Sequence, residues 1–539
     1  MKVSRFRLAL LSGLALCSIG PAWAHEGHYA GGASTFGAVQ FPTSCDPAVQ
    51  PRFERAVAML HSFFFPETVK AFEQIVATDP TCAMGWWGLA LSQRPNPLVP
   101  PWPSENLKRA WEAIQKGKDV ARSERERAWL EAAEPAFRDY DTVPTQVRSE
   151  RYEQAMAQLA AKYPDDAEAQ IFYALALLEA VDLNDKTYAR QIKAGEILER
   201  IFREQPDHPG LAHYIVHTYD FEPLAQRGVP AADRYAGIAP LAPHAQHMPS
   251  HIYSMLGRWK DSIRSNQRAI EASRTYAAEN APGTTFSQEP HAQDFLAYAY
   301  LQLGQDREVE RVIRELAAVR TFSGARNYAR DTGTIAPAVR YVLERQAWPE
   351  AISLPVRTDL YTYAQAMPRF ARALGAARLG KPDLARVEVE QLAALAGKAE
   401  SAYWSGQIEI LKLAASAWVS RSEGRDEDAL RLMREAAEHE NGSEKNVAME
   451  NRLYPMAELL GDMLMEMGRP REALVAYEAS LRAMPNRLHG FAGAAEAARA
   501  AGDLAKARTY FDKLARLGQG ADPGRNEIVQ ARAFLQSAR

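Results

Sequence analysis

Apolar positions recur at helical spacing along most of this 539-residue chain, from Phe53 onward. The alternation of β-branched and polar residues that marks a half-buried strand is almost absent. Short breaking motifs, such as Asp79-Pro80 and Pro164-Asp165, separate the helical segments. The pattern predicts an all-α fold in which each amphipathic helix buries one face against its neighbours.

Two C-terminal segments repeat at a fixed interval. A shift of 34 residues aligns Ala473 with Ala507 (507 − 473 = 34) and Tyr477 with Phe511. Helices and turns in the same order recur in the segments Glu67–Pro80, Ala83–Ser92, Tyr152–Leu178, Arg471–Pro485 and Leu504–Leu517. With this period and with small residues at the helix crossings, the chain resembles the tetratricopeptide repeat family. The resemblance implies an α-solenoid, a superhelix of helical hairpins whose concave side binds a protein or peptide partner.

The first 24 residues have the composition of a Sec-type signal peptide. Lys2, Arg5 and Arg7 precede a short apolar run from Leu8 to Ile19, and residues 22–24 read Ala-Trp-Ala, a cleavage motif. We therefore expect cleavage after Ala24 and a periplasmic or secreted protein. No later stretch is apolar enough to predict a membrane span.

The repeat register loosens from about Glu350 and recovers by Arg471. We therefore expect, after the signal peptide, a flexible N-terminal arm, an N-terminal solenoid with the candidate site and a C-terminal solenoid, in residues 25–52, 53–350 and 351–539. Cleavage after Ala24 would make His25 the N-terminal residue, where its amine and imidazole could chelate copper. The alternative is a flexible polar tail.

Loss of the signal peptide removes three basic residues, leaving 61 (64 − 3) against 67 acidic ones. This net negative charge argues against nucleic acid as a partner. Cys17 leaves with the signal peptide, so the mature chain keeps Cys45 and Cys82. In an oxidising compartment we expect them to form a disulfide, the alternative being two metal thiolates.

Seven of the 12 histidines lie between His208 and Asp294. His213 and His217 are four residues apart, and His247 and His251 repeat that spacing 34 residues later (247 − 213 = 34). Because positions i and i+4 share one face of a helix, each pair can direct two imidazoles the same way.

Three helices are expected to carry these histidines, in Pro209–Asp220, Pro243–Leu256 and Pro290–Leu303. Pro249 should kink the second helix, because it lacks a backbone donor. The candidate metal ligands are His213, His217, His244, His247, His251, His291 and Asp294. Asp220 could orient His217, and Tyr298 could face the site. His208 is interpreted as a turn residue and His61 as core packing.

The candidate ligands are too many for one tetrahedral ion, so either two ions bind or some of these residues lie outside the ligand set. Imidazole suits copper, iron and zinc, and six histidines would match a dinuclear copper pair. A metal-dependent oxidoreductase or hydrolase would use this centre for catalysis. The alternatives are a metal-binding or delivery protein without catalysis, and a protein-binding scaffold.

Two loops are expected near the candidate site. Residues Ser273–Pro290 form a polar insertion that could gate it. The proline-rich Pro95–Pro103 segment should be a rigid cover on the N-terminal helices. The C-terminal half contains only His439 and His489, and no chemical constellation is evident there.

Overall fold

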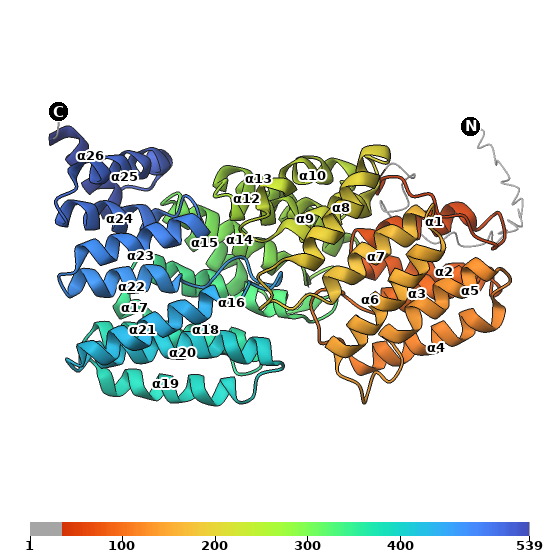
Figure 1. Ribbon diagram of the computed structural model, residues 1–539, viewed down its shortest axis with the longest axis horizontal. Coiled ribbons are helices and arrows are strands. Elements are labelled where there is room, and N and C mark those ends of the chain that lie inside the picture. Colours follow the sequence, from red (N-terminus) through yellow and green to blue (C-terminus); the bar gives the residue numbers. More distant parts are fainter. Residues whose placement is uncertain (1–34, 538–539) are drawn as a thin grey trace, which may run out of the picture. The chain divides into compact units, whose positions relative to one another are not determined.

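The computed structural model describes residues 35–537, which belong to one compact unit and are mostly helical (Figure 1). The predicted signal peptide and the candidate chelating residue His25 lie outside the described residues. Each helix packs mainly on the helices before and after it in the chain. This succession of helical hairpins confirms the expected all-α solenoid of tetratricopeptide-like units.

The N-terminal helices follow the predicted segments closely. They are α1 (Gln50–His61), α2 (Phe65–Thr78), α3 (Ala83–Ser92), α4 (Ser104–Val120), α5 (Glu124–Ala133), the 3₁₀ turn η3 (Glu134–Ala136), α6 (Thr145–Lys162), α7 (Ala167–Glu179) and α8 (Ala189–Glu204). The predicted disulfide between Cys45 and Cys82 is confirmed. It links the segment before α1 to the residue that directly precedes α3. Closing a loop of this length stabilises a fold by about 3–4 kcal/mol.

The expectation of a flexible arm is wrong for its described part, residues 35–52. Phe36, Val39 and Phe41 are buried, and Phe41 packs edge-on against Trp87 and beside Trp129. Three apolar side chains within six residues bury enough surface to hold this segment on the N-terminal helices.

The central helices hold the histidine-rich stretch. They are α9 (Pro209–Tyr219), α10 (Ala225–Ile238), α11 (Pro243–His247), α12 (Pro249–Met255), α13 (Trp259–Asn280), α14 (Glu289–Gln302), α15 (Asp306–Ala318) and α16 (Tyr328–Glu344). The expected kink is confirmed, since the second predicted helix divides at Met248, directly before Pro249. Proline has no amide hydrogen to continue the helical ladder.

The prediction of a polar insertion at Ser273–Pro290 is wrong for the first half of that segment, because α13 continues as helix to Asn280. Only the short segment between α13 and α14 is irregular. It contains the strand β1 (Thr285–Phe286), which pairs in parallel with β2 (Phe322–Ser323).

The C-terminal helices are α17 (Trp348–Ala351), α18 (Thr362–Arg378), α19 (Pro382–Ala396), α20 (Ala402–Ser422), α21 (Asp426–Asn441), α22 (Met456–Glu466), α23 (Pro470–Ala483), α24 (Leu488–Ala500), α25 (Leu504–Leu517), the turn η4 (Gly518–Gly520) and α26 (Asn526–Ser537). The α23 and α25 helices contain the two segments of the predicted repeat. Helix α16 packs directly on α18, so helix packing continues across the expected boundary at Glu350.

Some helices far apart in the sequence also touch. Helix α1 contacts α9, and α14 contacts α24. In a simple solenoid each unit contacts only its neighbours, so these extra contacts bring additional segments to the central helices. None of the helices within residues 35–537 combines the length and apolar character needed to cross a bilayer.

Candidate metal centre

The predicted ligands are six histidines and one aspartate. The six histidines gather where α9, α11, α12 and α14 approach one another. All six imidazoles are buried. They divide into two groups, each of whose candidate ligand nitrogens lie within 4.8 Å of one another. We call them group A (His213, His217 and His244) and group B (His247, His251 and His291).

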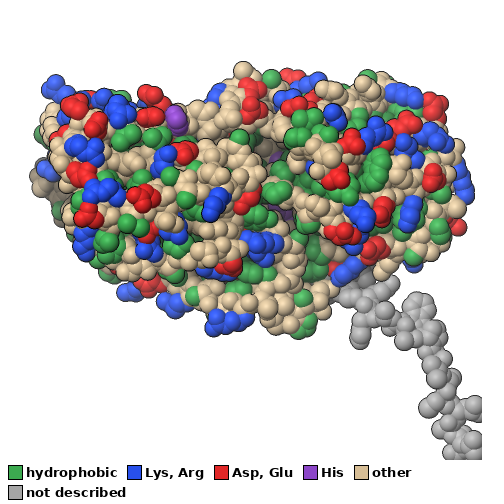
Figure 2. Space-filling view, turned by 90° about the horizontal axis from the view of Figure 1, so that it is seen from below, with side chains coloured by type: hydrophobic (Ala, Val, Ile, Leu, Met, Phe, Trp, Pro, Cys, Tyr) green, Lys and Arg blue, Asp and Glu red, His purple; other side chains and the backbone are tan. Residues whose placement is uncertain are grey.

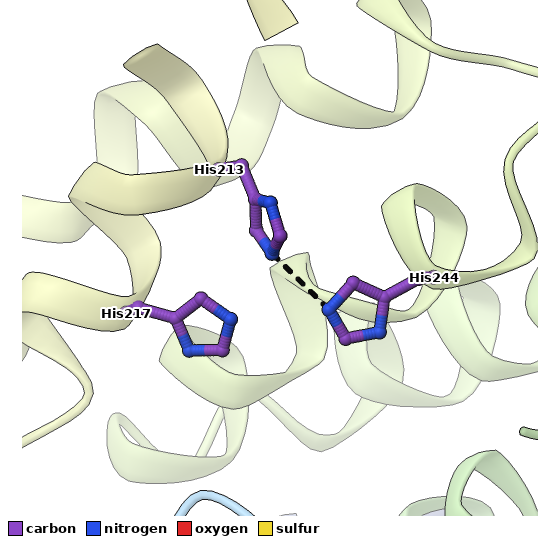
Figure 3. Close-up of side chains that lie close together, drawn as sticks. All are labelled: His213, His217 and His244. Atoms are coloured by element: carbon purple, nitrogen blue, oxygen red, sulfur yellow. Dashed lines mark hydrogen bonds between the residues drawn. The ribbon is translucent and has the colours of Figure 1, made fainter. Parts of the chain in front are cut away.

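In group A, the rings of His213 and His217 project from α9 toward His244 on α11 (Figure 3). The two groups adjoin: the ring centroids of His217 and His251 are 6.1 Å apart, and those of His244 and His247 are 6.2 Å apart. Two ions held there would lie within one shared site.

An aromatic ring covers each group. Phe63 lies 4.4 Å from His213 and 5.6 Å from His244, measured between ring centroids. It follows α1 with a left-handed backbone (φ 50°), a conformation that is costly for a residue with a Cβ atom. Phe295 packs in the same way on group B, 4.7 Å from both His247 and His251. These rings replace water around the imidazoles with apolar surface.

A small cavity of about 40 Å³ opens onto both groups. Its lining includes five of the six histidines, and Val99 of the proline-rich segment and Ser287 of the segment between α13 and α14 also border it. Both predicted loops therefore reach the site. Histidine side chains are visible in a furrow on one face of the molecule (Figure 2).

The hydrogen bonds of group B determine which ring nitrogens carry hydrogen. The Nδ1 atom of His247 lies 2.7 Å from the Asn266 Oδ1 atom. The Asn266 amide nitrogen donates to the Ser262 carbonyl, which fixes the orientation of that amide. Because Oδ1 can only accept, His247 donates through Nδ1, and its Nε2 atom carries a lone pair.

The same reasoning applies to His251. Its Nδ1 atom lies 2.8 Å from Asp220 Oδ2, and Lys445 Nζ lies 2.7 Å from that same oxygen. Because an ammonium group can only donate, Asp220 Oδ2 accepts from Lys445 and acts as a carboxylate acceptor. His251 therefore also donates through Nδ1. Its Nε2 atom then carries a lone pair as well.

The two lone-pair nitrogens face each other. His247 Nε2 and His251 Nε2 are 3.0 Å apart, and neither neutral ring has a hydrogen to place between them. Two nitrogens that bind one ion at about 2.0–2.1 Å stand about 2.9–3.4 Å apart. A shared cation removes the repulsion between the lone pairs.

Protonation is the other way to remove that repulsion, and burial opposes it. Desolvation lowers the pKa of His247 to about 4, and it lowers the pKa of His251 and His291 well below the ordinary value. All three imidazoles are therefore neutral at pH 7, the form that binds metal.

Group A is also neutral, but its hydrogen bonds are less complete. His213 Nδ1 donates to the His61 carbonyl at 2.5 Å, and burial lowers the pKa of His213 to about 3. The Nε2 atom of His213 therefore carries a lone pair, 3.1 Å from His244 Nε2. Neither ring nitrogen of His217 has a hydrogen-bond partner among the described residues. A buried imidazole without partners is costly unless it binds something.

The predicted ligand Asp294 belongs to neither group. Its Oδ1 atom accepts from Arg340 Nε at 3.0 Å, in an ion pair that is buried on both sides. Tyr298 also lies elsewhere: it packs on Trp259, and its hydroxyl accepts a hydrogen bond from Arg487 at 2.5 Å. The sequence register places both residues on the correct helix but cannot show that arginines engage them.

Asp220 contacts a different histidine from the one expected. The sequence predicts that it orients His217, one turn before it, but it accepts from His251 on α12. Lys445, between α21 and α22, holds Asp220 from the other side. Sequence reasoning missed Lys445, because nothing in the local pattern of the C-terminal half connects it to α9.

A further buried cluster was also missed. His61 Nε2 and His208 Nε2 lie 2.9 Å and 2.8 Å from the two oxygens of Glu168. His61, expected to be core packing, thus has polar partners, and so does His208, which precedes α9. Here an N–H faces each carboxylate oxygen, so the cluster needs no cation.

Comparisons with known proteins add little to this site. No protein-family model matches the chain, and no curated protein matches it. Among solved structures, the human IFIT1 dimer with PPP-AAAA is similar at 13% identity, with a TM-score of 0.37, covering 87% of this chain and 90% of that one. A superposition this loose supports no conclusion about this chain.

Proposed function

We propose that this chain is a metalloprotein that holds two transition-metal ions, one in each trihistidine group, and that it acts as an oxidoreductase on a small molecule. The observation that carries the proposal is the approach of two acceptor nitrogens, His247 Nε2 and His251 Nε2, to 3.0 Å. Nitrogen-only ligand sets favour copper among the metals considered, with iron and zinc as the other candidates.

Three protein ligands leave a coordination position open on each ion. Both positions would face the cavity of about 40 Å³, which admits only a few water-sized molecules. Dioxygen or peroxide is of this size. Copper bound there would supply electron transfer to such a molecule. Phe63 and Phe295 exclude bulk water, burial keeps the imidazoles neutral, and hydrogen bonds fix the Nδ1 hydrogens of His247 and His251.

Hydrolysis is less well supported, because it needs a general base near the metal-bound water. No carboxylate lines the cavity among the described residues. Asp294 is engaged by Arg340, and Asp220 by Lys445 and His251. An oxidoreductase needs no such base at the metal.

Elemental analysis of the purified mature protein tests the proposal. We expect two copper, iron or zinc ions per chain after loading. His217→Ala and His251→Ala should each remove one ion, from group A and group B respectively, while the double variant should bind none. The matched control is His439→Ala, because His439 is an exposed histidine on α21. Metal content that the double variant retains would overturn the proposal.

A second candidate is a protein-binding scaffold, which stacked helical hairpins support. Turnover separates the alternatives. Copper-loaded protein that consumes dioxygen or peroxide with an added reductant is an oxidoreductase. Loaded protein that consumes neither is a metal carrier, and a chain that binds no metal is left with the scaffold role.

A further inference from the structure

One tyrosine beside group A has a base ready to accept its proton. Tyr214 follows the candidate ligand His213 on α9, and their ring centroids are 5.3 Å apart. The Tyr214 side chain is fully buried, and its hydroxyl lies 2.9 Å from His61 Nδ1. Oxidation of a phenol in a dry interior requires loss of its proton, so this contact has chemical consequences.

The neighbouring carboxylate determines the direction of this hydrogen bond. His61 Nε2 faces Glu168 Oε2 at 2.9 Å, and Glu168 also accepts from His208. These two imidazoles lower the pKa of Glu168 to about 2, despite its burial, so the group is a carboxylate. His61 therefore donates through Nε2 and accepts the Tyr214 hydrogen at Nδ1. An imidazolium formed at His61 would be paired with Glu168 at once.

Aromatic rings continue from this tyrosine toward the surface. His61 lies 5.5 Å from Tyr214 and 4.8 Å from Phe172, measured between ring centroids. Phe172 is 5.1 Å from Trp87, and Trp87 is 5.3 Å from Trp129. Tryptophan and tyrosine are the side chains that lose an electron most readily, and here every step between adjacent rings is 5.5 Å or shorter.

The outer end of the series, Trp129, is itself buried but hydrogen-bonds a partly exposed group. Trp129 Nε1 donates to Asp166 Oδ2 at 3.3 Å, and Asp166 forms a partly exposed ion pair with Arg125. Both residues of that pair border an open hollow in the surface. A one-electron reductant in solution can therefore approach the last tryptophan through its hydrogen-bonded partner.

We propose that Tyr214, Trp87 and Trp129 form an electron relay between the trihistidine centre and the surface. The proposal rests on the function proposed above, in which dioxygen or peroxide oxidises the metal centre. In the first step the Tyr214 O–H bond would break, with the proton passing to His61 Nδ1 and the electron to the metal that the trihistidine groups would hold, once dioxygen or peroxide has oxidised it. The tyrosyl oxygen then regains that proton with an electron from the tryptophans, and an external one-electron reductant restores Trp129.

The chain contains a matched control for Tyr214. Tyr235 stacks on the same ligand, with ring centroids 5.1 Å apart and an interplanar angle of 16°, and it is equally buried. Its hydroxyl lies beside the Ser62 hydroxyl, which is not a base at neutral pH. Tyr235 shares with Tyr214 the contact with His213 but has no basic proton acceptor.

Electron paramagnetic resonance of freeze-quenched samples tests the relay in copper-loaded protein mixed with peroxide. We expect a tyrosyl signal in the wild type and in Tyr235→Phe, and its loss in Tyr214→Phe. In Trp129→Phe the signal should outlast that of the wild type several-fold when ferrocyanide is present. An undiminished signal in Tyr214→Phe, or decay of the Trp129→Phe signal at the wild-type rate, overturns the relay.

Failure of the relay is distinguishable from failure of the metal proposal, because each variant's metal content is measured first. If the chain binds no metal, the relay is tested in metal-free protein with a soluble photogenerated oxidant. A long-lived tyrosyl radical that requires Tyr214 but not Tyr235 supports it. Equal radical yields in Tyr214→Phe and Tyr235→Phe reject it.

Discussion

The Lys445 ammonium lies 2.7 Å from a carboxylate oxygen of Asp220, although 225 residues separate them. Through Asp220 the lysine fixes the hydrogen on His251 Nδ1 and thereby leaves Nε2 free for a metal. The segment around Lys445 is held in place by other long-range contacts, such as the Glu444 amide donating to the Leu183 carbonyl. The C-terminal half, where the sequence shows no chemical constellation, thus completes the candidate centre.

Neutralising this pair should weaken metal binding at group B. In the double variant Asp220→Asn with Lys445→Met, the introduced side-chain amide oxygen can still accept from His251, and no unpaired charge remains buried. Loss of the carboxylate makes the His251 imidazole a poorer donor to metal, so affinity should fall by about 10–100-fold. Competition with a chelator of known affinity measures this change.

The control for that variant is Arg340→Met with Asp294→Asn, which neutralises a buried ion pair beside the centre but outside both groups. Its metal affinity should match that of the wild type. Equal affinity in all three proteins would show that Asp220 has no role in metal binding.

Acid should release the metal from this site at a lower pH than from a site made of exposed histidines. Exposed imidazoles compete with a metal as pH falls through about 6.5. Burial lowers the pKa of His247 to about 4 and that of His213 to about 3, so protons compete at these sites only near those values. Metal retained at pH 5 and released between about pH 4 and 3 is expected, measured by elemental analysis after gel filtration.

The same shifts affect the stability of the metal-free protein. At these histidines the unfolded chain binds more protons than the folded chain between about pH 6.5 and 4, so their contribution to the free energy of unfolding falls as pH falls. Circular dichroism on each sample therefore separates release by folded protein from release by unfolding. Release from folded protein near pH 6.5 would contradict the buried, neutral histidines described above.

One histidine away from the centre, His489, should make the free energy of unfolding fall as pH rises. His489 on α24 lies 2.9 Å from Asp462, and that carboxylate raises the pKa of His489 to about 9 despite its burial. The folded state holds this proton more tightly than the unfolded state. The pair therefore contributes its full stability below about pH 6.5, and this contribution is lost as pH rises through about 9.

Urea unfolding of the wild type and of His489→Gln, compared between about pH 6 and 9.5, measures the effect. The difference in unfolding free energy should shrink across this range by up to roughly 3 kcal/mol, the value of a shift of about two and a half pKa units. A difference that stays constant with pH would mean that the proton on His489 does not stabilise the fold.

The sequence by itself determined the helices, their order and the spacing of the histidines. Periodicity within one helix is local, so it correctly placed His213 with His217 on one face and His247 with His251 on another. The helix that begins at Pro243 ends directly before Pro249, as predicted, because proline has no amide hydrogen to continue the helical ladder. The predicted loss of Cys17 with the signal peptide leaves Cys45 and Cys82 to form one disulfide, and the structure contains that disulfide.

Only the tertiary structure decided how these residues divide among partners. Both His244 and His247 lie on α11, yet His244 groups with the histidines of α9, while His247, three residues later, groups with those of α12 and α14. Asp294 pairs with Arg340 and Asp220 with Lys445 across 46 and 225 residues. No helical period specifies such distances. They follow from how the stacked hairpins bring distant units into contact, and in a dry interior each buried carboxylate requires a partner.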